Sequence, residues 1–238
     1  MITADTIFKE LKNKSNKDEA LKSARFFKTG KGEYGEGDKF LGMQLKDVQN
    51  IVKENWNKIT LQQLEKLLHN GWHEARTTAL SMLVKKYEKA KDLSEKKAIV
   101  DLYLGNVKYI NNWDLVDISC HKIIGPYVYE TGKVEILYKL ADSGYLWSER
   151  ISVVSCLYFI KKGDFKDILK LSEKFLNHKH DLMHKAVGWM LRETGKKEEK
   201  VLLKFLDENS MKMPRTALRY SIEKLDNDAR KYYMNKGK

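Results

Sequence analysis

The apolar positions of this chain recur with the period of an α-helix over most of its length. In residues 3–14, Ile7 and Leu11 lie on one apolar stripe, and in residues 17–29, Ala20, Ala24 and Phe27 form the next. Side chains three or four positions apart share one face of a helix, so this spacing predicts amphipathic helices. Two prolines in 238 residues leave few interior breaks. The sequence therefore predicts an all-α protein.

The helical pattern returns after Phe40-Leu41-Gly42 and continues almost to the C-terminus. Short polar turns divide it into segments, and we find no strand pattern between them. Short helices joined by short turns favour antiparallel helix pairs. We expect further helices at 44–56, 60–69, 72–90, 94–105, 113–124, 132–142, 146–162, 164–177, 181–194, 197–208 and 213–225.

The run Gly-Lys-Gly-Glu-Tyr-Gly-Glu-Gly at 30–37 interrupts this pattern. Glycines at 30, 32 and 35 match the letters of a dinucleotide-binding fingerprint. That fingerprint requires a preceding strand and a βαβ unit, whereas here a predicted helix precedes it. We therefore reject a nucleotide cofactor and predict a mobile glycine-rich loop whose backbone is able to approach a phosphate.

Basic residues recur near the start of the second helix of successive pairs. Arg76, Arg150, Lys185 and Arg215 each lead into a run of small and aliphatic residues. Arg150, Lys185 and Arg215 follow one another at 35 and 30 residues, and the 74 residues from Arg76 to Arg150 equal two periods of 37, with the Trp113 helix midway. This spacing is typical of HEAT-type helix pairs, which stack into a curved solenoid. Equivalent helices of such repeats line one surface, so these residues, with Arg219, would form a basic stripe along it.

The charge of the chain agrees with a polyanionic partner. Lys and Arg number 45 against 33 acidic residues, which gives a net charge of +12. Basic groups that neutralise phosphates release condensed counterions and so favour binding to nucleic acid. The alternative is a lysine-rich surface without a nucleic-acid partner, and charge alone does not separate the two.

The cysteines and the apolar segments indicate the cellular compartment in which the protein is expected. Cys120 and Cys156 lie in apolar helical segments without the spacing of a disulfide framework or a metal site, so we expect buried thiols in a reducing compartment. The first residues lack an export pattern, and no apolar run reaches the roughly 20 residues that span a bilayer. We therefore expect a cytoplasmic protein without a membrane partner.

The segment 111–117, Asn-Asn-Trp-Asp-Leu-Val-Asp, carries the first candidate chemistry. Trp113 and Asp117 are four residues apart and so share a helix face. Asp114 lies at the expected helix start, where a carboxylate stabilises the N-terminus. Asp117 has no such role and is flanked by apolar residues. An acid in that setting is either paired with a base or kept for function.

The predicted helix that begins at Asp181 carries the second candidate group. Lys185, Trp189 and Arg192 fall on one stripe of it. Gly188 lies among them and costs about 1 kcal/mol relative to alanine, so we expect a close backbone approach there. A sugar-phosphate could be bound by two indoles, Trp113 and Trp189, together with the Asp117 carboxylate and several cations. The alternative is structural: both tryptophans pack in the core, and Asp117 pairs with Arg150 or Arg192.

Three histidines, His178, His180 and His184, provide a possible metal site, which we reject. His180 and His184 share a helix face, but the segment lacks the glutamate of a zinc protease and a third ligand. We therefore expect turn and helix-surface histidines and no metal.

The sequence resembles the AlkD family of bacterial DNA alkylation repair glycosylases over nearly its whole length. The motif Trp-Asp-x-Val-Asp matches residues 113–117, Trp-x-x-Arg matches 147–150, and Gly-Trp-x-Leu-Arg-Glu matches 188–193. Phe40-Leu41-Gly42 fits as well. This chain has Lys46 where family members often carry proline, and its glycine-rich loop is longer than in the better studied members.

The resemblance implies a fold and a function. The fold would be a right-handed superhelical solenoid of paired antiparallel HEAT-like helical repeats, forming a single domain over 1–238. The function would be excision of cationic N3- or N7-alkylated purines from double-stranded DNA by a monomer without cofactor or metal. A non-catalytic HEAT-repeat module that binds damaged or branched DNA is the alternative. The residues expected to act are Asp117, Trp113 and Trp189 in catalysis and Arg150, Arg192, Lys185, Arg76 and Arg215 in DNA binding.

Overall fold

The structure, a computed structural model, describes residues 2–236 and is all-helical over that range. Its only extended pairing there consists of two isolated parallel bridges, Ile2 with Ile59 and Lys39 with Trp72. The predicted all-α class and the paired short helices are confirmed. None of the described helices combines the length and the apolar content needed to cross a membrane.

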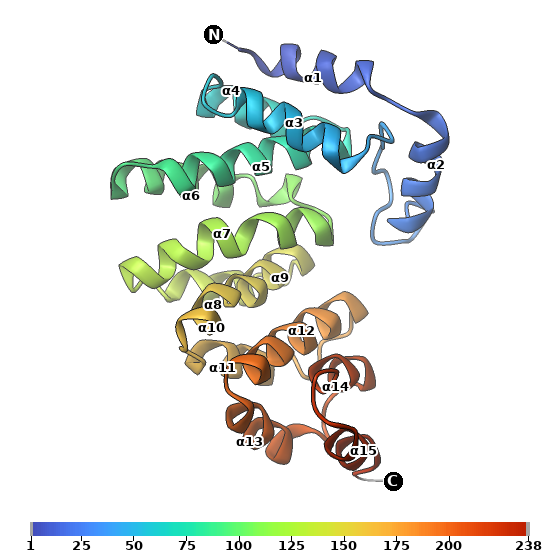
Figure 1. Cartoon of the computed structure of the whole chain (residues 1–238), viewed down its shortest axis with the longest axis vertical. Helices are drawn as coiled ribbons and strands as arrows, with labels where there is room; N and C mark the ends of the chain where they lie inside the picture. Colours follow the sequence, from blue (N-terminus) through green and yellow to red (C-terminus); the bar gives the residue numbers. More distant parts are fainter. Residues whose placement is uncertain (1, 237–238) are drawn as a thin grey trace. The chain divides into compact units, whose positions relative to one another are not determined.

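The chain divides into two compact units, with the boundary after Ile123 inside α7. We describe each unit by itself, and the expectation of a single domain over 1–238 stays a prediction. In unit 1, α5 packs against α3, α4 and α6 (Figure 1). The elements up to the boundary are α1 (Ala4–Asn13), α2 (Lys17–Phe26), α3 (Leu45–Asn55), α4 (Leu61–Leu68), α5 (His73–Lys89), α6 (Leu93–Gly105), the 3-10 helix η1 (Val107–Tyr109) and α7 (Trp113–Thr131).

Unit 2 is organised around α12, which packs against α9, α10, α11, α13 and α14 (Figure 1). Its helices after α7 are α8 (Glu135–Ala141), α9 (Leu146–Ser155), α10 (Leu157–Lys162), α11 (Lys166–Lys174), α12 (Asp181–Lys197), α13 (Glu199–Asn209), α14 (Arg215–Ser221) and α15 (Asn227–Asn235).

Short polar side chains cap the N-termini of many of these helices. The side chains of Thr3, Asn16, Thr60, Asp92 and Asp226 each accept a hydrogen bond from a backbone N–H in the first turn of the helix that follows. These bonds satisfy donors that a helix leaves without an internal partner, which fixes where each helix begins.

The largest differences between the predicted and the observed helices are three. The segment predicted at 113–124 continues to Thr131, because Pro126 lies in a helix whose following residues, Tyr127 and Val128, are buried. The segment predicted at 146–162 is two helices, α9 and α10, which meet at Cys156. Helix α15 was not predicted, because Tyr233 is its only buried residue and it has no apolar stripe.

The close approach predicted at Gly188 is confirmed. A Cβ atom added there would lie 2.5 Å from Cβ of Tyr220 and 2.6 Å from the carbonyl oxygen of Ala217. The glycine therefore allows α12 and α14 to pack closely. Cys120 and Cys156 are buried and form no disulfide, as expected.

Candidate functional site

Trp113 is the first residue of α7 and is held by aromatic rings from the end of α2. Its backbone N–H donates to Oδ1 of Asn112 at 2.8 Å. Its indole stacks on Phe27 with ring centroids 5.5 Å apart and meets Phe26 edge-on at 6.0 Å. The side chain is partly exposed. Unit 1 thus fixes the indole in place while leaving part of it open to a ligand.

Asp117 lies one turn further along α7, on the same face as Trp113. Leu115 and Val116 between them are fully buried, whereas Asp117 retains partial exposure. The predicted pairing of an indole and an acid on one helix face is therefore what α7 presents. Asp117 is therefore not fully enclosed in the hydrophobic interior.

A buried charged network next to Trp113 was not predicted from the sequence. His73, the first residue of α5, lies between two carboxylates: its Nδ1 is 2.9 Å from Oδ2 of Asp38, and its Nε2 is 2.7 Å from Oδ2 of Asp114. The amide of Asn112 also donates to Asp38, at 3.2 Å. The network therefore connects the end of the glycine-rich loop, α5 and the start of α7.

Opposite charges within this network determine its protonation. Burial alone would lower the pKa of His73, but the hydrogen bonds to Asp114 and Asp38, and their charges, raise its pKa to about 9. Burial would raise the pKa of Asp38, but the hydrogen bond from His73 and the charge of Arg76 lower it below its usual value. At neutral pH His73 is therefore a buried imidazolium held by two carboxylates.

Arg76 belongs to this network, which corrects its predicted place in a solvent-facing basic stripe. Only 5% of the residue is exposed, and its guanidinium forms an ion pair with Asp38 and donates to Oδ1 of Asn111. Arg76 lies one turn from His73 on α5, so both point toward the same buried acid. Its charge is used inside the protein to hold the segment that precedes Trp113.

Asp114 also differs in its partner from what we expected. It lies in the first turn of α7, as predicted, but Oδ2 accepts a hydrogen bond from His73. The backbone N–H of Trp113 at this helix start is instead satisfied by Asn112. Asp114 therefore ties α7 to α5.

Glu74 explains the Phe40-Leu41-Gly42 motif. Its buried carboxylate accepts the backbone N–H groups of Leu41 at 2.9 Å and Gly42 at 2.8 Å. Gly42 has a φ of +75°, and an added Cβ atom would lie 2.1 Å from the carbonyl oxygen of Asn16. Only glycine fits this left-handed, crowded position. The motif thus fixes the segment that carries Asp38 and Phe40 against α2 and α5.

The glycine-rich loop at 30–37 is folded by its own hydrogen bonds. Glu33 accepts the N–H of Gly30 at 2.9 Å, and Glu36 accepts the N–H of Gly32 at 2.8 Å. An added Cβ atom at Gly35 would lie 2.3 Å from the carbonyl oxygen of Phe27. The glycines therefore let the loop pack against the end of α2, next to the rings that support Trp113.

In unit 2, α12 presents Lys185, Trp189 and Arg192 on one partly exposed stripe. Lys185 pairs with Asp181 at 2.9 Å, and both side chains are solvent-accessible. Arg192 forms an ion pair with Glu223. Surface pairs of this kind contribute little to stability, so a phosphate is able to replace the carboxylate partner.

Arg150 is interior, in contrast to the solvent-facing position predicted for it. Only 4% of the residue is exposed, and Nη1 donates to the carbonyl oxygen of Leu182 at 2.5 Å. Because Leu182 lies in the first turn of α12, this bond joins α9 to the helix that carries Trp189. Arg215, in contrast, is exposed at the start of α14 and donates to the carbonyl oxygen of Met234 at 3.0 Å.

The three histidines at 178, 180 and 184 build the start of α12. His178 lies 3.0 Å from Oε2 of Glu149, and His184 lies 2.5 Å from the carbonyl oxygen of His178. His180 is the N-cap and accepts the N–H of Leu182. Each histidine therefore has a local structural partner.

A profile of a protein family described as DNA alkylation repair enzyme matches residues 7–225 of this chain. The match includes the ring cluster, α7 and α12. The chain belongs to the DNA alkylation repair enzyme family. The resemblance inferred from the motifs at 113–117, 147–150 and 188–193 is thereby confirmed.

A solved structure with the same fold comes from Enterococcus faecalis and is described as a predicted DNA alkylation repair enzyme. It aligns with a TM-score of 0.72 and 18% sequence identity, covering 90% of this chain and 98% of that one. At this identity the likeness establishes the fold. No protein of curated function matches the chain. Membership of the family gives this chain a role in repair of alkylated DNA, with DNA as its partner.

In this DNA repair protein, the sequence contains only weak indications that Asp38 and His73 belong to a buried charged network. Asp38 follows a run of glycines and charged residues, and nothing nearby shows that its partners are 35 and 38 positions away. A histidine and an arginine one turn apart on the buried face of α5 were the available sign, since such groups are rarely buried unless paired.

Proposed function

We propose that this protein is a monofunctional DNA glycosylase that hydrolyses the N-glycosidic bond of cationic N3- or N7-alkylated purines in duplex DNA. The observation that supports it most is the arrangement of Trp113 and Asp117 on α7. The indole is fixed by rings from α2, and Asp117 one turn away is partly exposed. A protein that only bound DNA would need basic residues but no such pair.

The chemistry fits these two side chains. A purine alkylated at N3 or N7 carries a positive charge, so the bond from C1′ to the base breaks with its electrons moving to the base, which leaves neutral. No general acid is therefore required. The cation that develops at C1′ needs stabilisation, which Asp117 supplies by its negative charge. Water adds to C1′ and gives its proton to the carboxylate, while the face of Trp113 offers electron density to the sugar.

The remaining predicted residues are assigned by where their side chains lie. Trp189, Lys185 and Arg192 on α12 and Arg215 on α14 are accessible, and we propose that they contact the sugar-phosphate backbone. Arg76 and Arg150 act within the protein, Arg76 by holding the segment before Trp113 and Arg150 by holding the start of α12. The proposed reaction needs neither cofactor nor metal, because the leaving group already carries its charge, and we expect a monomer.

The direct test is a single-turnover assay with duplex DNA that contains 7-methylguanine. With excess protein, free base should be released well above the spontaneous rate, and an identical duplex with unmodified guanine should release none. Tight binding without release would instead favour the alternative, a non-catalytic HEAT-repeat module that binds damaged DNA.

The proposed phosphate contacts predict salt-sensitive binding. The affinity of the native protein for undamaged duplex should fall steeply with salt, because each neutralised phosphate releases counterions. Lys185→Ala should weaken binding severalfold and lower the slope of log K against log salt by about 1. Lys97→Ala on α6, which removes a lysine paired with Asp101 in the same way, is the control. Fluorescence anisotropy across a salt series measures both. Equal slopes for the two variants would remove Lys185 from the interface.

A further inference from the structure

Asp114 is the residue through which α5 holds the first turn of α7. It directly follows Trp113, and its Oδ2 accepts a hydrogen bond from Nε2 of His73 at 2.7 Å. Its other carboxylate oxygen, Oδ1, is buried and has no hydrogen-bond donor among the residues that the structure describes. A buried carboxylate oxygen is costly unless a donor or a positive charge compensates it. Within the described part of the chain, the position of Asp114 therefore depends on its bond with His73.

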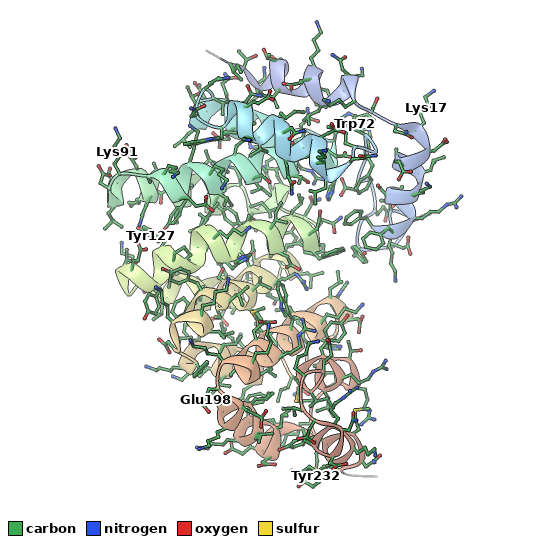
Figure 2. All side chains as sticks on the ribbon, viewed as in Figure 1. Lys17, Trp72, Lys91, Tyr127, Glu198 and Tyr232 are labelled. Carbon is green, nitrogen blue, oxygen red and sulfur yellow. The ribbon has the colours of Figure 1, made fainter. Side chains whose placement is uncertain are left out.

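Asp38, the other acid bonded to His73, has further support. It also forms an ion pair with Arg76. Trp72, labelled in Figure 2, forms a parallel bridge with Lys39, and the N–H of His73 donates to the Lys39 carbonyl oxygen at 2.8 Å. The start of α5 and the backbone next to Asp38 are thus joined by main-chain bonds as well as by charge. His73 is therefore a fixed point, and Asp114 is held from it.

The rings around Trp113 support its indole, and the backbone of α7 sets where the indole lies among them. The indole stacks on Phe27 at 5.5 Å and meets Phe26 edge-on at 6.0 Å. Aromatic pairs are favourable over centroid distances of about 4.5 to 7 Å, so the indole is able to shift slightly and keep both contacts. His73 packs on Phe27 at 4.9 Å. The same histidine thus contacts the supporting ring and holds the residue that follows Trp113.

We propose that Asp114 is a positioning residue that, through its bond with His73, holds the Trp113 indole where it contacts the sugar of the modified nucleotide. This inference rests on the proposed function, because it takes Trp113 to contact that sugar. Asp114 itself needs no contact with DNA. Misplacing a group at the reaction centre by about 1 Å costs up to about 100-fold in rate. Loss of the bond should therefore slow the reaction much more than it weakens DNA binding.

The first test measures 7-methylguanine release and duplex affinity for Asp114→Ala. Loss of the carboxylate should lower the single-turnover rate by about tenfold or more and change the affinity by less than about threefold. Asp114→Asn, which keeps an acceptor oxygen for His73, should lose less rate. Asp228→Ala removes an exposed acid from the first turn of α15 and controls for the loss of negative charge at a helix N-terminus. It should behave as the native protein.

The second test asks whether the effect depends on the indole. In a Trp113→Leu background, Asp114→Ala should lower the rate by a much smaller factor than in the native protein, because the two residues act as a unit. Fluorine NMR of protein labelled with 5-fluorotryptophan adds a measurement that needs no activity. The resonance of Trp113, assigned by its loss in Trp113→Leu, should shift in Asp114→Ala, shift less in Asp114→Asn and stay in place in Asp228→Ala.

The outcomes separate this inference from the proposed function. If the native protein releases base, and Asp114→Ala keeps the native rate or lowers it by the same factor with and without the indole, the positioning role is overturned and the glycosylase proposal stands. An equal loss of rate and affinity would also overturn it. If no base is released, but the Trp113 resonance shifts in Asp114→Ala, the hold on Trp113 stands and the glycosylase proposal fails. Thermal melting checks the fold; if Asp114→Ala unfolds, an unshifted Trp113 resonance in Asp114→Asn overturns the inference.

Discussion

Replacing Asp117 with asparagine should lower the single-turnover rate of 7-methylguanine release by about 100-fold or more. The amide has nearly the same shape as the carboxylate, but it neither carries the negative charge that stabilises a cation at C1′ nor accepts a proton from water. Affinity for the duplex should change by less than about threefold, because the lost interaction forms mainly in the transition state. The rate comes from chromatography of released base, and the affinity from anisotropy.

Asp101→Asn provides the matched control for this experiment. Asp101 is an exposed aspartate on α6, paired with Lys97, and its replacement should leave both rate and affinity unchanged. If Asp117→Asn has a normal melting temperature and releases 7-methylguanine at the rate of the native protein, Asp117 takes no part in the chemistry. An equal loss in both variants would point to a general effect of removing negative charge.

The stability of unit 1 should fall as the pH rises from about 6.5 to 9, because of His73. Its pKa is raised from 6.5 to about 9 in the folded protein, so the folded state binds the proton more tightly than the unfolded state. The stabilisation is complete below pH 6.5 and is lost as the pH passes through 9. A shift of this size corresponds to about 3 kcal/mol in the free energy of unfolding.

Urea denaturation across this pH range compares the native protein with His73→Gln. The variant should be several kcal/mol less stable at pH 6.5, since Asp38 and Asp114 lose the imidazolium between them while Asp38 keeps its ion pair with Arg76. Its stability should change less between pH 6.5 and 9. His69→Gln, at an exposed histidine outside the network, should keep the native pH profile. If His73→Gln does not fold, Asp114→Asn removes one of the two carboxylates and should reduce the slope. The same pH slope in native and variant protein would contradict the assignment of a charged His73.

The fold was predictable because it depends on local pattern. Apolar residues at helical spacing, such as Ile7 and Leu11, are buried as predicted. Where the pattern was weak, prediction failed: α15 buries only Tyr233 and so has no periodic stripe. Pro126 is a local stop signal that tertiary burial overrides.

The candidate site was predictable only where its residues are neighbours in sequence. Trp113 and Asp117 share a face because four residues separate them on α7. The partners of Asp38 lie on α5 and before α7, and such distant pairing leaves no periodic trace in the sequence. The basic stripe assumed that every arginine at a helix start faces solvent. Arg76 and Arg150 are buried because acceptors inside the protein, Asp38 and the Leu182 carbonyl, compensate them.

The most direct test of the central claim is a crystal structure of Asp117→Asn bound to duplex DNA containing 2′-fluoro-7-methylguanosine, whose glycosidic bond resists cleavage. The proposal predicts the sugar of the modified nucleotide against the indole of Trp113, with C1′ beside residue 117. Duplex DNA bound on another surface, with Trp113 and residue 117 away from the modified sugar, would contradict it.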